Sequence, residues 1–341
     1  LSEIWAEVIG LGAHPIGVRD NFLELGGDSV ALIRMLSRVR NELGANVGAR
    51  EFFARPTIEH LCELVGGGSG APASSTLIPV QERGSRPPIH CVPAADGSML
   101  VFKNVLKELG PDQPFYGFEV PSVRPGGEQV ISIAEIARRN VASLRAVQPT
   151  GPYWLAGYCW GCTVAAEMAR QIVEQGDAVA QLILIDPLHP GSYRFFLANP
   201  LALIGVMVQV LNPGREIDLM SLEAFEGRSL DEQLAAAFLE LRKGHLLPDD
   251  MVLDLFTTTF RQFRNCFAAL VAHEPGRYDG AMALVTVDDY PEDWVDHWRR
   301  IAAGLCVLPV RGMHYSILSD QILATELVAK LRPLLPSGGA Q

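Results

Sequence analysis

The chain has 341 residues and a net charge of −11, with 48% hydrophobic and 20% charged residues. This composition excludes a disordered or low-complexity chain, and the acidic balance argues against a nucleic-acid partner. At roughly 100–150 residues per domain, the length predicts two domains. The longest apolar runs fall short of the roughly 18–20 residues of a membrane span, and no signal peptide is recognisable, so we expect a cytoplasmic protein without a membrane partner. The first residue is not Met, so we expect a piece of a longer chain.

The first 65 residues carry helical periodicity and no run typical of a strand. The apolar positions of a first helix are Ile4, Trp5, Val8 and Ile9. A second helix is expected over Ser29–Leu43, with an apolar face of Val30, Ile33, Leu36 and Val39. Thr57 is the expected N-cap of a last short helix. We therefore predict a small all-α bundle of four helices over residues 1–65.

A short linker separates this bundle from the rest of the chain. Residues 66–76 read GGGSGAPASST, without a charged or bulky side chain. Such a composition cannot bury apolar surface and behaves as a flexible linker.

Residues 77–336 alternate between short apolar runs and helical stretches. The runs are residues 89–92, 153–156, 182–185, 282–287 and 306–309. Helical stretches such as residues 133–147 and 163–174 lie between most of them, which predicts an α/β domain with a mostly parallel sheet covered on both faces. Residues 190–267 show helical periodicity alone. We expect them to form a helical lid at the carboxyl edge of the sheet.

Residues 153–166 read as a strand, then Gly157-Tyr158-Cys159-Trp160-Gly161, then a helix. This pattern is the nucleophile elbow of α/β-hydrolases, with Cys159 in the usual place of serine. An alternative is that Cys159 and Cys162 form a redox pair or half of a zinc site. Against zinc, the chain has no second closely spaced cysteine pair, and against both alternatives the flanking glycines remain unexplained. We predict an active-site cysteine and no metal.

An elbow predicts an acid and then a base further along the chain. Asp186 directly follows a buried apolar run and is the favoured acid, with Asp288 or Asp289 as the rival. His314 lies in the loop after the last run and is the favoured base, with His189 as its nearest competitor.

The negatively charged oxygen that forms during acyl transfer also needs hydrogen-bond donors. We expect the backbone N–H groups of Trp160 and Ala94 to supply them, the latter from the loop after residue 92.

Residues 23–30 read LELGGDSV, which places Ser29 at the start of the second helix. An ordinary N-cap explains the serine but not the two glycines before it. This segment resembles the L-G-G-x-S signature of peptidyl carrier domains of nonribosomal peptide synthetases. The resemblance covers residues 1–65 and implies a 4′-phosphopantetheine arm on Ser29. It also implies a phosphopantetheinyl transferase and upstream synthetase domains as partners.

Residues 77–336 resemble the thioesterase domains that terminate such assembly lines. Two departures are Cys159 in place of serine, and Val92 where many relatives have histidine. Cys-type terminal thioesterases are associated with four-membered rings. The resemblance therefore implies transfer of a peptidyl thioester from the chain's own carrier to Cys159 and release by cyclisation to a β-lactam or, next, a β-lactone. Hydrolytic or macrocyclising release is the alternative, and a non-catalytic carrier-docking module is the second.

Overall fold

The computed structural model describes residues 1–11, 15–27, 29–45, 47–48, 51–52, 55–66, 75–121, 130–211, 227–247 and 251–336. The chain divides into two compact units. One comprises Leu1–Ala73 with Arg215–Thr257, and the other comprises Ser74–Gly214 with Thr258–Gln341. The first border falls inside the expected linker. Residues 215–257 are grouped with the first unit and not with the rest of residues 77–336. The domain limits expected from the sequence therefore stay predictions.

The described part of residues 1–65 contains helices α1 (Ser2–Ile9), α2 (Ser29–Leu43) and α4 (Ile58–Val65). Helix α2 has the predicted bounds, and Thr57 caps α4 by accepting a hydrogen bond from the His60 N–H. A fourth helix stays a prediction. The rings of Trp5, Phe22 and Phe52 form the core, packed edge to face with centroids 5.0–5.9 Å apart.

The apolar face of α2 differs from the predicted one. Its buried described side chains are Ala31, Leu32, Met35 and Val39, whereas Leu36 is only half-buried. The side chains of Val30 and Ile33 lie outside the described residues. Of the predicted stripe, Val39 is therefore confirmed as buried and Leu36 is not, and the buried positions 32, 35 and 39 share one side of the helix.

The described residues of the second unit form a seven-stranded sheet in the order β1-β3-β2-β4-β5-β6-β7. Strand β1 is antiparallel to β3, and all other neighbouring pairs are parallel. The strands are β1 (Leu77–Gln81), β2 (Ile89–Val92), β3 (Phe115–Phe118), β4 (Tyr153–Tyr158), β5 (Val179–Ile185), β6 (Tyr278–Thr286) and β7 (Ala302–Pro309).

All five predicted apolar runs lie in the sheet, and the predicted α/β architecture is confirmed. Strands β1 and β3 were not predicted. Pro79 interrupts β1, which lies at the edge of the sheet, and Gly117 interrupts the four-residue β3. Both residues are poor strand formers, so neither segment stands out from the sequence.

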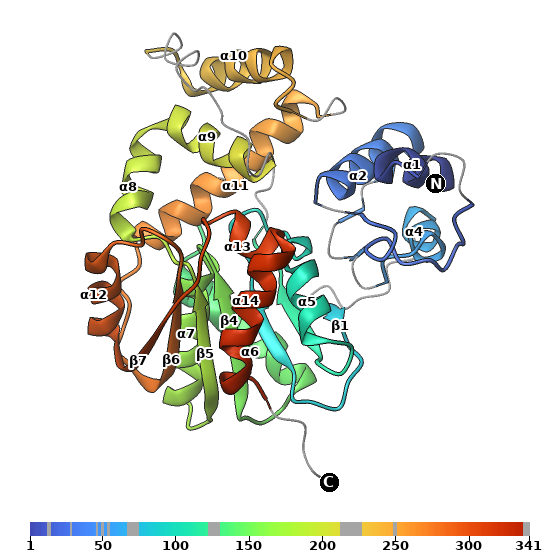
Figure 1. Ribbon diagram of the computed structural model, residues 1–341. Helices are drawn as coiled ribbons and strands as arrows, with labels where there is room; N and C mark the ends of the chain where they lie inside the picture. The colour runs from blue at the N-terminus through green and yellow to red at the C-terminus, as the bar shows by residue number, and fades with distance from the viewer. Residues whose placement is uncertain are drawn as a thin grey trace. The chain divides into compact units, whose positions relative to one another are not determined.

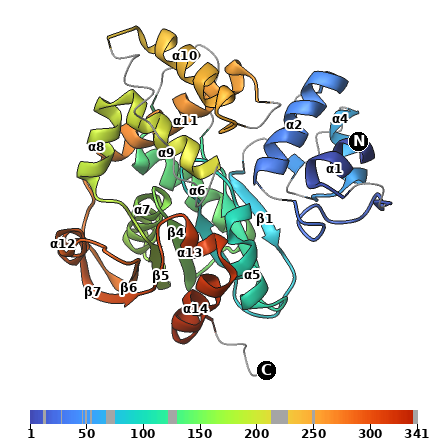
Figure 2. The same ribbon diagram turned by 45° about the horizontal axis from the view of Figure 1, so that its top comes forward.

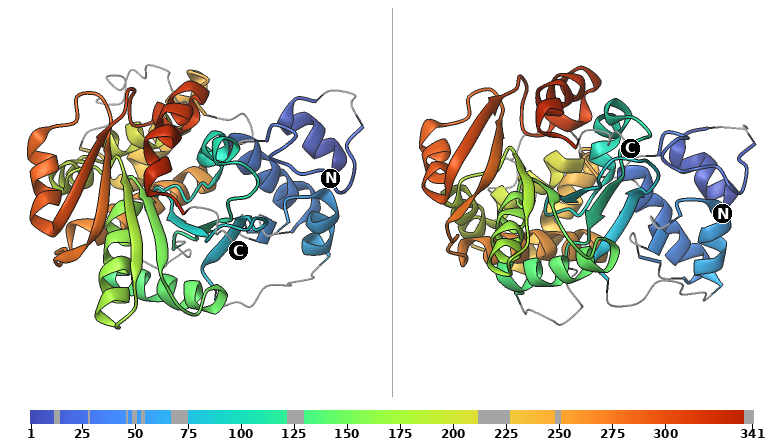
Figure 3. Two further views of the ribbon diagram at one scale, coloured as in Figure 1. Left: turned by 60° about the horizontal axis from the view of Figure 1, so that its bottom comes forward. Right: turned by 90° about the horizontal axis from the view of Figure 1, so that it is seen from below.

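Helices cover both faces of the sheet. Helices α5 (Lys103–Leu109) and α14 (Gln321–Leu331) lie on one face, and α6 (Ile133–Val147) and α7 (Gly161–Glu174) lie on the other (Figure 3). Figure 2 shows the short α13 (Ser316–Ser319) beside α5 and α14. The remaining short elements of this unit are α12 (Glu292–Ile301), η1 (Leu100–Phe102) and η3 (Arg332–Leu334).

Every described helix or strand element within residues 190–267 is a helix, as predicted. Helices α8 (Pro190–Ala198) and α9 (Pro200–Leu211) follow the carboxyl end of β5 (Figure 1). Helices α10 (Leu230–Lys243) and α11 (Leu253–Val271) come later, and α11 runs four residues past the expected end at 267. Residues 212–226 and 248–250 of the predicted lid lie outside the described residues.

Among the described helices, none alone is long and apolar enough to cross a membrane. Helices α8 and α9 meet that test of length and composition only as a pair, bent by 114°.

Candidate active site

Cys159 occupies a sharp turn between β4 and α7. Its φ angle is +55°, in the left-handed region that non-glycine residues rarely adopt. Such a conformation costs about 1–3 kcal/mol and is found mainly at functional sites. The Cys159 N–H donates a 3.1 Å hydrogen bond to the carbonyl of Ile185, which ties the turn to the end of β5. The side chain is 8% exposed. The elbow is therefore present, with its thiol nearly shielded from solvent.

The two flanking glycines are required by close packing of the backbone. A Cβ at Gly157 would lie 2.6 Å from the Cα of Cys162, and one at Gly161 would lie 2.3 Å from the carbonyl oxygens of Val92 and Pro93. Real Cβ atoms do not approach backbone this closely. The missing side chain at Gly161 thus lets the start of α7 lie against the loop after β2.

The structure brings Asp186 and His314 together. Asp186 follows β5, and its Oδ2 lies 2.6 Å from Nδ1 of His314, in the loop after β7. Since an ionised carboxylate only accepts hydrogen bonds, Nδ1 carries the proton and Nε2 is left for another partner. The charge of Cys159 acts on the same imidazole and is one of the causes that raise its pKa. The structure therefore joins the predicted acid to the predicted base, and the role of Cys159 as their nucleophile stays a prediction.

The protonated form of His314 is stabilised in this setting. Burial by itself lowers the pKa of His314, but the charge and hydrogen bond of Cys159, together with those of Asp186, outweigh it and raise the pKa to about 10. The imidazole is thus held as a cation between two acidic partners.

The rival residues take other positions. Oδ2 of Asp288 accepts a 2.8 Å hydrogen bond from the N–H of Gly312, so Asp288 binds the backbone of the His314 loop. His189 is the N-cap of α8, where its Nδ1 accepts a 3.1 Å hydrogen bond from the Gly191 N–H. These contacts give Asp288 and His189 structural roles, in place of the roles of acid and base for which they were the alternatives.

The two predicted oxyanion donors lie on elements that pack together. Trp160 is the N-cap residue of α7, and Ala94 belongs to the loop against which Gly161 packs. Among the described residues, neither N–H donates to a backbone carbonyl. The loop is held by Gln262 of α11, whose Nε2 donates a 2.9 Å hydrogen bond to the carbonyl of Ala95. This geometry is compatible with an oxyanion hole.

The indole of Trp160 supplies a second link between α11 and the elbow. Its Nε1–H donates a 2.8 Å hydrogen bond to the carbonyl of Cys266. The C-terminal part of α11 is thereby fixed over the turn that carries Cys159.

Three polar groups near Cys159 were not predicted. Tyr193 of α8 and Tyr315 both interact with the charge of Cys159. Asp96 lies in the loop after β2, where burial raises its pKa to about 6 despite hydrogen bonds from the backbone of Ser98 and from its own N–H. Sequence motifs could not reveal these groups because no fixed spacing relates them to the elbow.

Cys162 differs from Cys159 in its surroundings. Its Sγ–H donates to the carbonyls of Gly157 and Ile185, at 3.2 and 3.4 Å. Burial, followed by the charge of Cys159, raises the Cys162 pKa well above its ordinary value. Within the described ranges, no group of three or more His, Cys, Asp or Glu residues could hold a metal ion. Cys162 is thus an inert structural thiol, which argues against the redox alternative.

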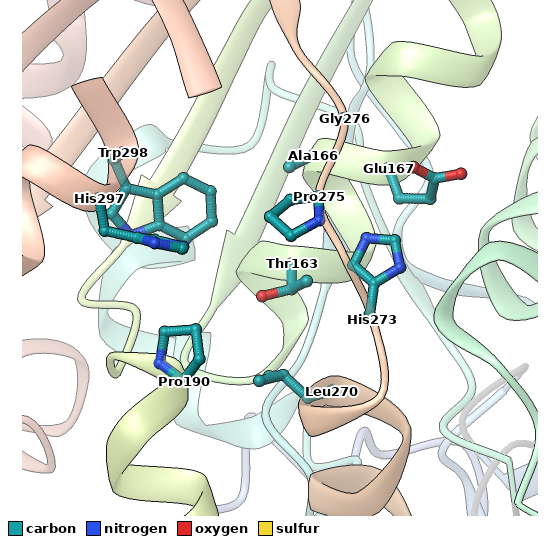
Figure 4. Close-up of a pocket in the computed structure, with 10 residues that line it drawn as sticks. All are labelled: Thr163, Ala166, Glu167, Pro190, Leu270, His273, Pro275, Gly276, His297 and Trp298. Atoms are coloured by element: carbon teal, nitrogen blue, oxygen red, sulfur yellow. The ribbon is translucent and has the colours of Figure 1, made fainter. Parts of the chain in front are cut away.

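A small hollow of about 20 Å³ lies between α7, α12 and the end of α11 (Figure 4). In Figure 4 the side chain of His273 lies near Glu167, and that of His297 lies beside Trp298. Burial, and then the charge of His189, lowers the pKa of His297 to about 4, so its imidazole is neutral. The hollow has room for about one water molecule and excludes an acyl chain. None of the predicted site residues lines it.

Ser29 is the first residue of the 15-residue helix α2. The turn before it depends on glycine: Gly26 has a φ of +96°, and a Cβ at Gly27 would lie 2.3 Å from the Phe22 ring. Free N–H groups in the first turn of a helix stabilise a phosphate there. The residues at this end of α2 therefore fit a phosphodiester at Ser29.

Comparison with known proteins gives matches for both parts of the chain. Residues 87–331 match the family model of the thioesterase domain, and residues 1–65 match that of the phosphopantetheine attachment site. Malpinin synthetase of Mortierella alpina is 37% identical over 196 residues, which are 57% of this chain but only 2% of that protein. The chain thus spans a small fraction of this relative's length.

Solved structures show the same fold. A holo four-domain nonribosomal peptide synthetase bound to AMP and glycine has a TM-score of 0.64 at 22% identity, covering 97% of this chain and 25% of that one. The NocB thioesterase domain in covalent complex with a fluorophosphonate nocardicin G analogue has a TM-score of 0.54 at 21% identity, covering 76% and 99%. The thioesterase model spans most of the chain. This chain therefore belongs to the thioesterase domain family, and its thioesterase domain is preceded by a domain that carries covalently attached 4′-phosphopantetheine.

Proposed function

We propose that the chain ends a nonribosomal peptide synthesis by moving a peptidyl group from its carrier domain to Cys159 and releasing it by cyclisation. The observations that support this most directly are the strained turn that carries Cys159 and the hydrogen bond between Asp186 and His314. A nucleophile, a base and an acid that orients the base are the parts that acyl transfer through a covalent intermediate requires.

The carrier part of the proposal places the arm on Ser29. When bound there, 4′-phosphopantetheine supplies a thiol that holds the peptide as a thioester. A phosphopantetheinyl transferase and upstream synthetase domains are the partners that this arrangement requires. All six cysteines are free thiols in the structure, in keeping with the cytoplasmic location that we propose.

In the loading step, the Cys159 sulfur adds to the thioester carbonyl. The N–H groups of Trp160 and Ala94 would stabilise the oxyanion that forms. The bond from the carbonyl carbon to the departing thiol then breaks, and His314 gives that thiol its proton. Asp186 keeps His314 oriented and balances its positive charge.

The cysteine favours cyclisation over hydrolysis for chemical reasons. Loading converts one thioester into another, so the acyl group stays activated. A thioester prefers an amine over water more strongly than an oxoester does, and a thiolate leaves more readily than an alkoxide. In release, an N–H or O–H of the peptide attacks the carbonyl, His314 takes its proton, and the bond to Cys159 breaks. These properties suit closure of a strained four-membered ring, a β-lactam first and a β-lactone second.

Product analysis tests the proposal. The didomain protein is given a synthetic peptidyl pantetheine thioester that carries an internal amine or hydroxyl, and the products are identified by mass spectrometry. We expect a product lighter than the linear acid by one water, with the nucleophile joined to the carbonyl. A linear acid or a macrocycle would overturn the four-membered ring while leaving the thioesterase assignment.

Variants at the cysteine separate the remaining cases. Cys159→Ser should retain loading and shift the products toward the linear acid. Cys306→Ser, at an exposed free thiol, is the matched control and should leave the products unchanged. Failure of Cys159 to react with a pantetheine-linked electrophile would instead indicate a non-catalytic docking module.

A further inference from the structure

The hydroxyl of Tyr193 is a buried polar group without a structural role. Tyr193 lies on α8 and is 0% exposed. Its ring packs edge to face on Phe267 of α11, with centroids 4.7 Å apart at 77°. Among the described residues, no hydrogen-bond partner satisfies its hydroxyl, sulfur acceptors included. Leaving a buried hydroxyl in this state costs about 1–3 kcal/mol, so packing alone favours Phe at this position.

The hydroxyl belongs to the part of the fold that carries the nucleophile, because Phe267 follows Cys266, whose carbonyl binds the indole of Trp160 next to Cys159. Burial, and then the charge and a side-chain interaction of Cys159, hold the Tyr193 pKa well above its ordinary value. The phenol therefore stays protonated and can only donate toward the sulfur. The charge of Cys159 acts on His314 as well, so side chains from two different parts of the chain respond to the nucleophile.

We propose that Tyr193 is a further catalytic residue, whose O–H donates a hydrogen bond to the Cys159 sulfur whenever that sulfur is a thiolate. This inference rests on the proposed role of Cys159 as nucleophile. In the release step, the electron pair of the breaking carbon–sulfur bond goes to the sulfur, and the proton of the attacking group goes to His314. Tyr193 transfers no proton; it stabilises the departing charge.

The release step depends on this donor more than loading does. During loading, the charge on Cys159 is consumed as the new carbon–sulfur bond forms, so a donor stabilises the reactant. During release, the same charge reappears, so the donor stabilises the leaving group. Loss of the hydroxyl should therefore slow release and let the acyl-enzyme accumulate.

Tyr278 provides a matched control. It too is buried, at 2% exposed, with a hydroxyl that no described residue satisfies, at the start of β6. Burial alone raises its pKa to about 12. Tyr278→Phe therefore removes the same kind of hydroxyl without touching the thiol.

The experiment measures alkylation of Cys159 by iodoacetamide as a function of pH in the intact didomain protein. We expect Tyr193→Phe to move the midpoint upward by about one pH unit, because a hydrogen bond to a charged group is lost, while Tyr278→Phe leaves it unchanged. With the pantetheine thioester, Tyr193→Phe should slow release about tenfold and change loading less than threefold. Equal midpoints in Tyr193→Phe and the unsubstituted protein would overturn the proposal.

A second measurement tests the proposal if the Tyr193→Phe variant fails to fold. Installing 3-fluorotyrosine at position 193 alone keeps the ring and makes the phenol a stronger donor. The alkylation midpoint should then fall, and an unchanged midpoint counts against Tyr193. A protein that releases no product would contradict the proposed function. Because alkylation needs no turnover, its midpoints would still decide the role of Tyr193.

Discussion

The hydroxyl of Tyr158 donates a 2.6 Å hydrogen bond to the carbonyl oxygen of His314, and its ring stacks on the imidazole with centroids 5.1 Å apart at 21°. Tyr158 directly precedes Cys159, so the segment that positions the sulfur also holds the loop of the base. This one side chain links the end of β4 to the loop after β7. Tyr158 is thus a positioning residue of the site.

Tyr158→Phe should reduce loading of Cys159 about 2- to 12-fold, which corresponds to one lost hydrogen bond of about 0.5–1.5 kcal/mol. The ring stacking is retained, so the free energy of unfolding should fall by no more than this amount. Single-turnover kinetics with the pantetheine thioester measure the loading rate. Tyr116→Phe is the control, since Tyr116 likewise stacks on a histidine, His90, on a different part of the sheet. An equal effect of both substitutions would contradict a positioning role.

Asp186→Asn should lower the release rate by about 10³- to 10⁴-fold, because an amide no longer keeps the imidazole in its orientation or balances its charge. Asp289→Asn tests the rival position: Asp289 is exposed and has a φ of +59°, a conformation that Asn tolerates. We expect it to retain nearly full activity. Steady-state product formation distinguishes the two, and a larger loss in the Asp289 variant would reverse the assignment of the acid.

The interaction of His314 with its partners should depend on pH. Its folded-state pKa is about 10, above the unfolded value of about 6.5. The imidazolium therefore contributes stability that is fully present below about pH 6.5 and is lost as the pH rises through about 10. Urea unfolding of the unsubstituted protein and of His314→Gln between pH 6 and 10.5 measures this. The difference in free energy of unfolding should shrink across that range, and a difference that grows with pH would contradict the ion pair.

Gly161→Ala should disrupt the elbow. The added Cβ would lie 2.3 Å from two carbonyl oxygens, and overpacking of this kind costs about 1–3 kcal/mol of stability. Because the start of α7 must move away from the Ala94 loop, we also expect loading to fall by about 10²–10³-fold. Gly304→Ala on β7 is the control, since its Cβ would have its nearest neighbour at 4.0 Å. Urea unfolding and single-turnover loading report the two effects, and an active, stable Gly161→Ala protein would show that the close packing is not needed.

The sequence by itself determined the elements whose stabilisation is local or repetitive. The bounds of α2 and the positions of five strands follow from their own apolar side chains, and the elbow follows from two glycines around Cys159. Short or interrupted strands were missed because β1 and β3 are strands only by virtue of pairing with each other and with β2.

Only the tertiary structure decided which distant side chains meet. Strands β5 and β6 are neighbours in the parallel sheet, so Asp186 and Asp288 both follow strand ends at the same edge. The choice between them depends on the direction of each side chain toward His314, which no spacing encodes. The position of Tyr193 was decided in the same way: its ring packs on Phe267 of α11, a contact that exists only once the chain has folded.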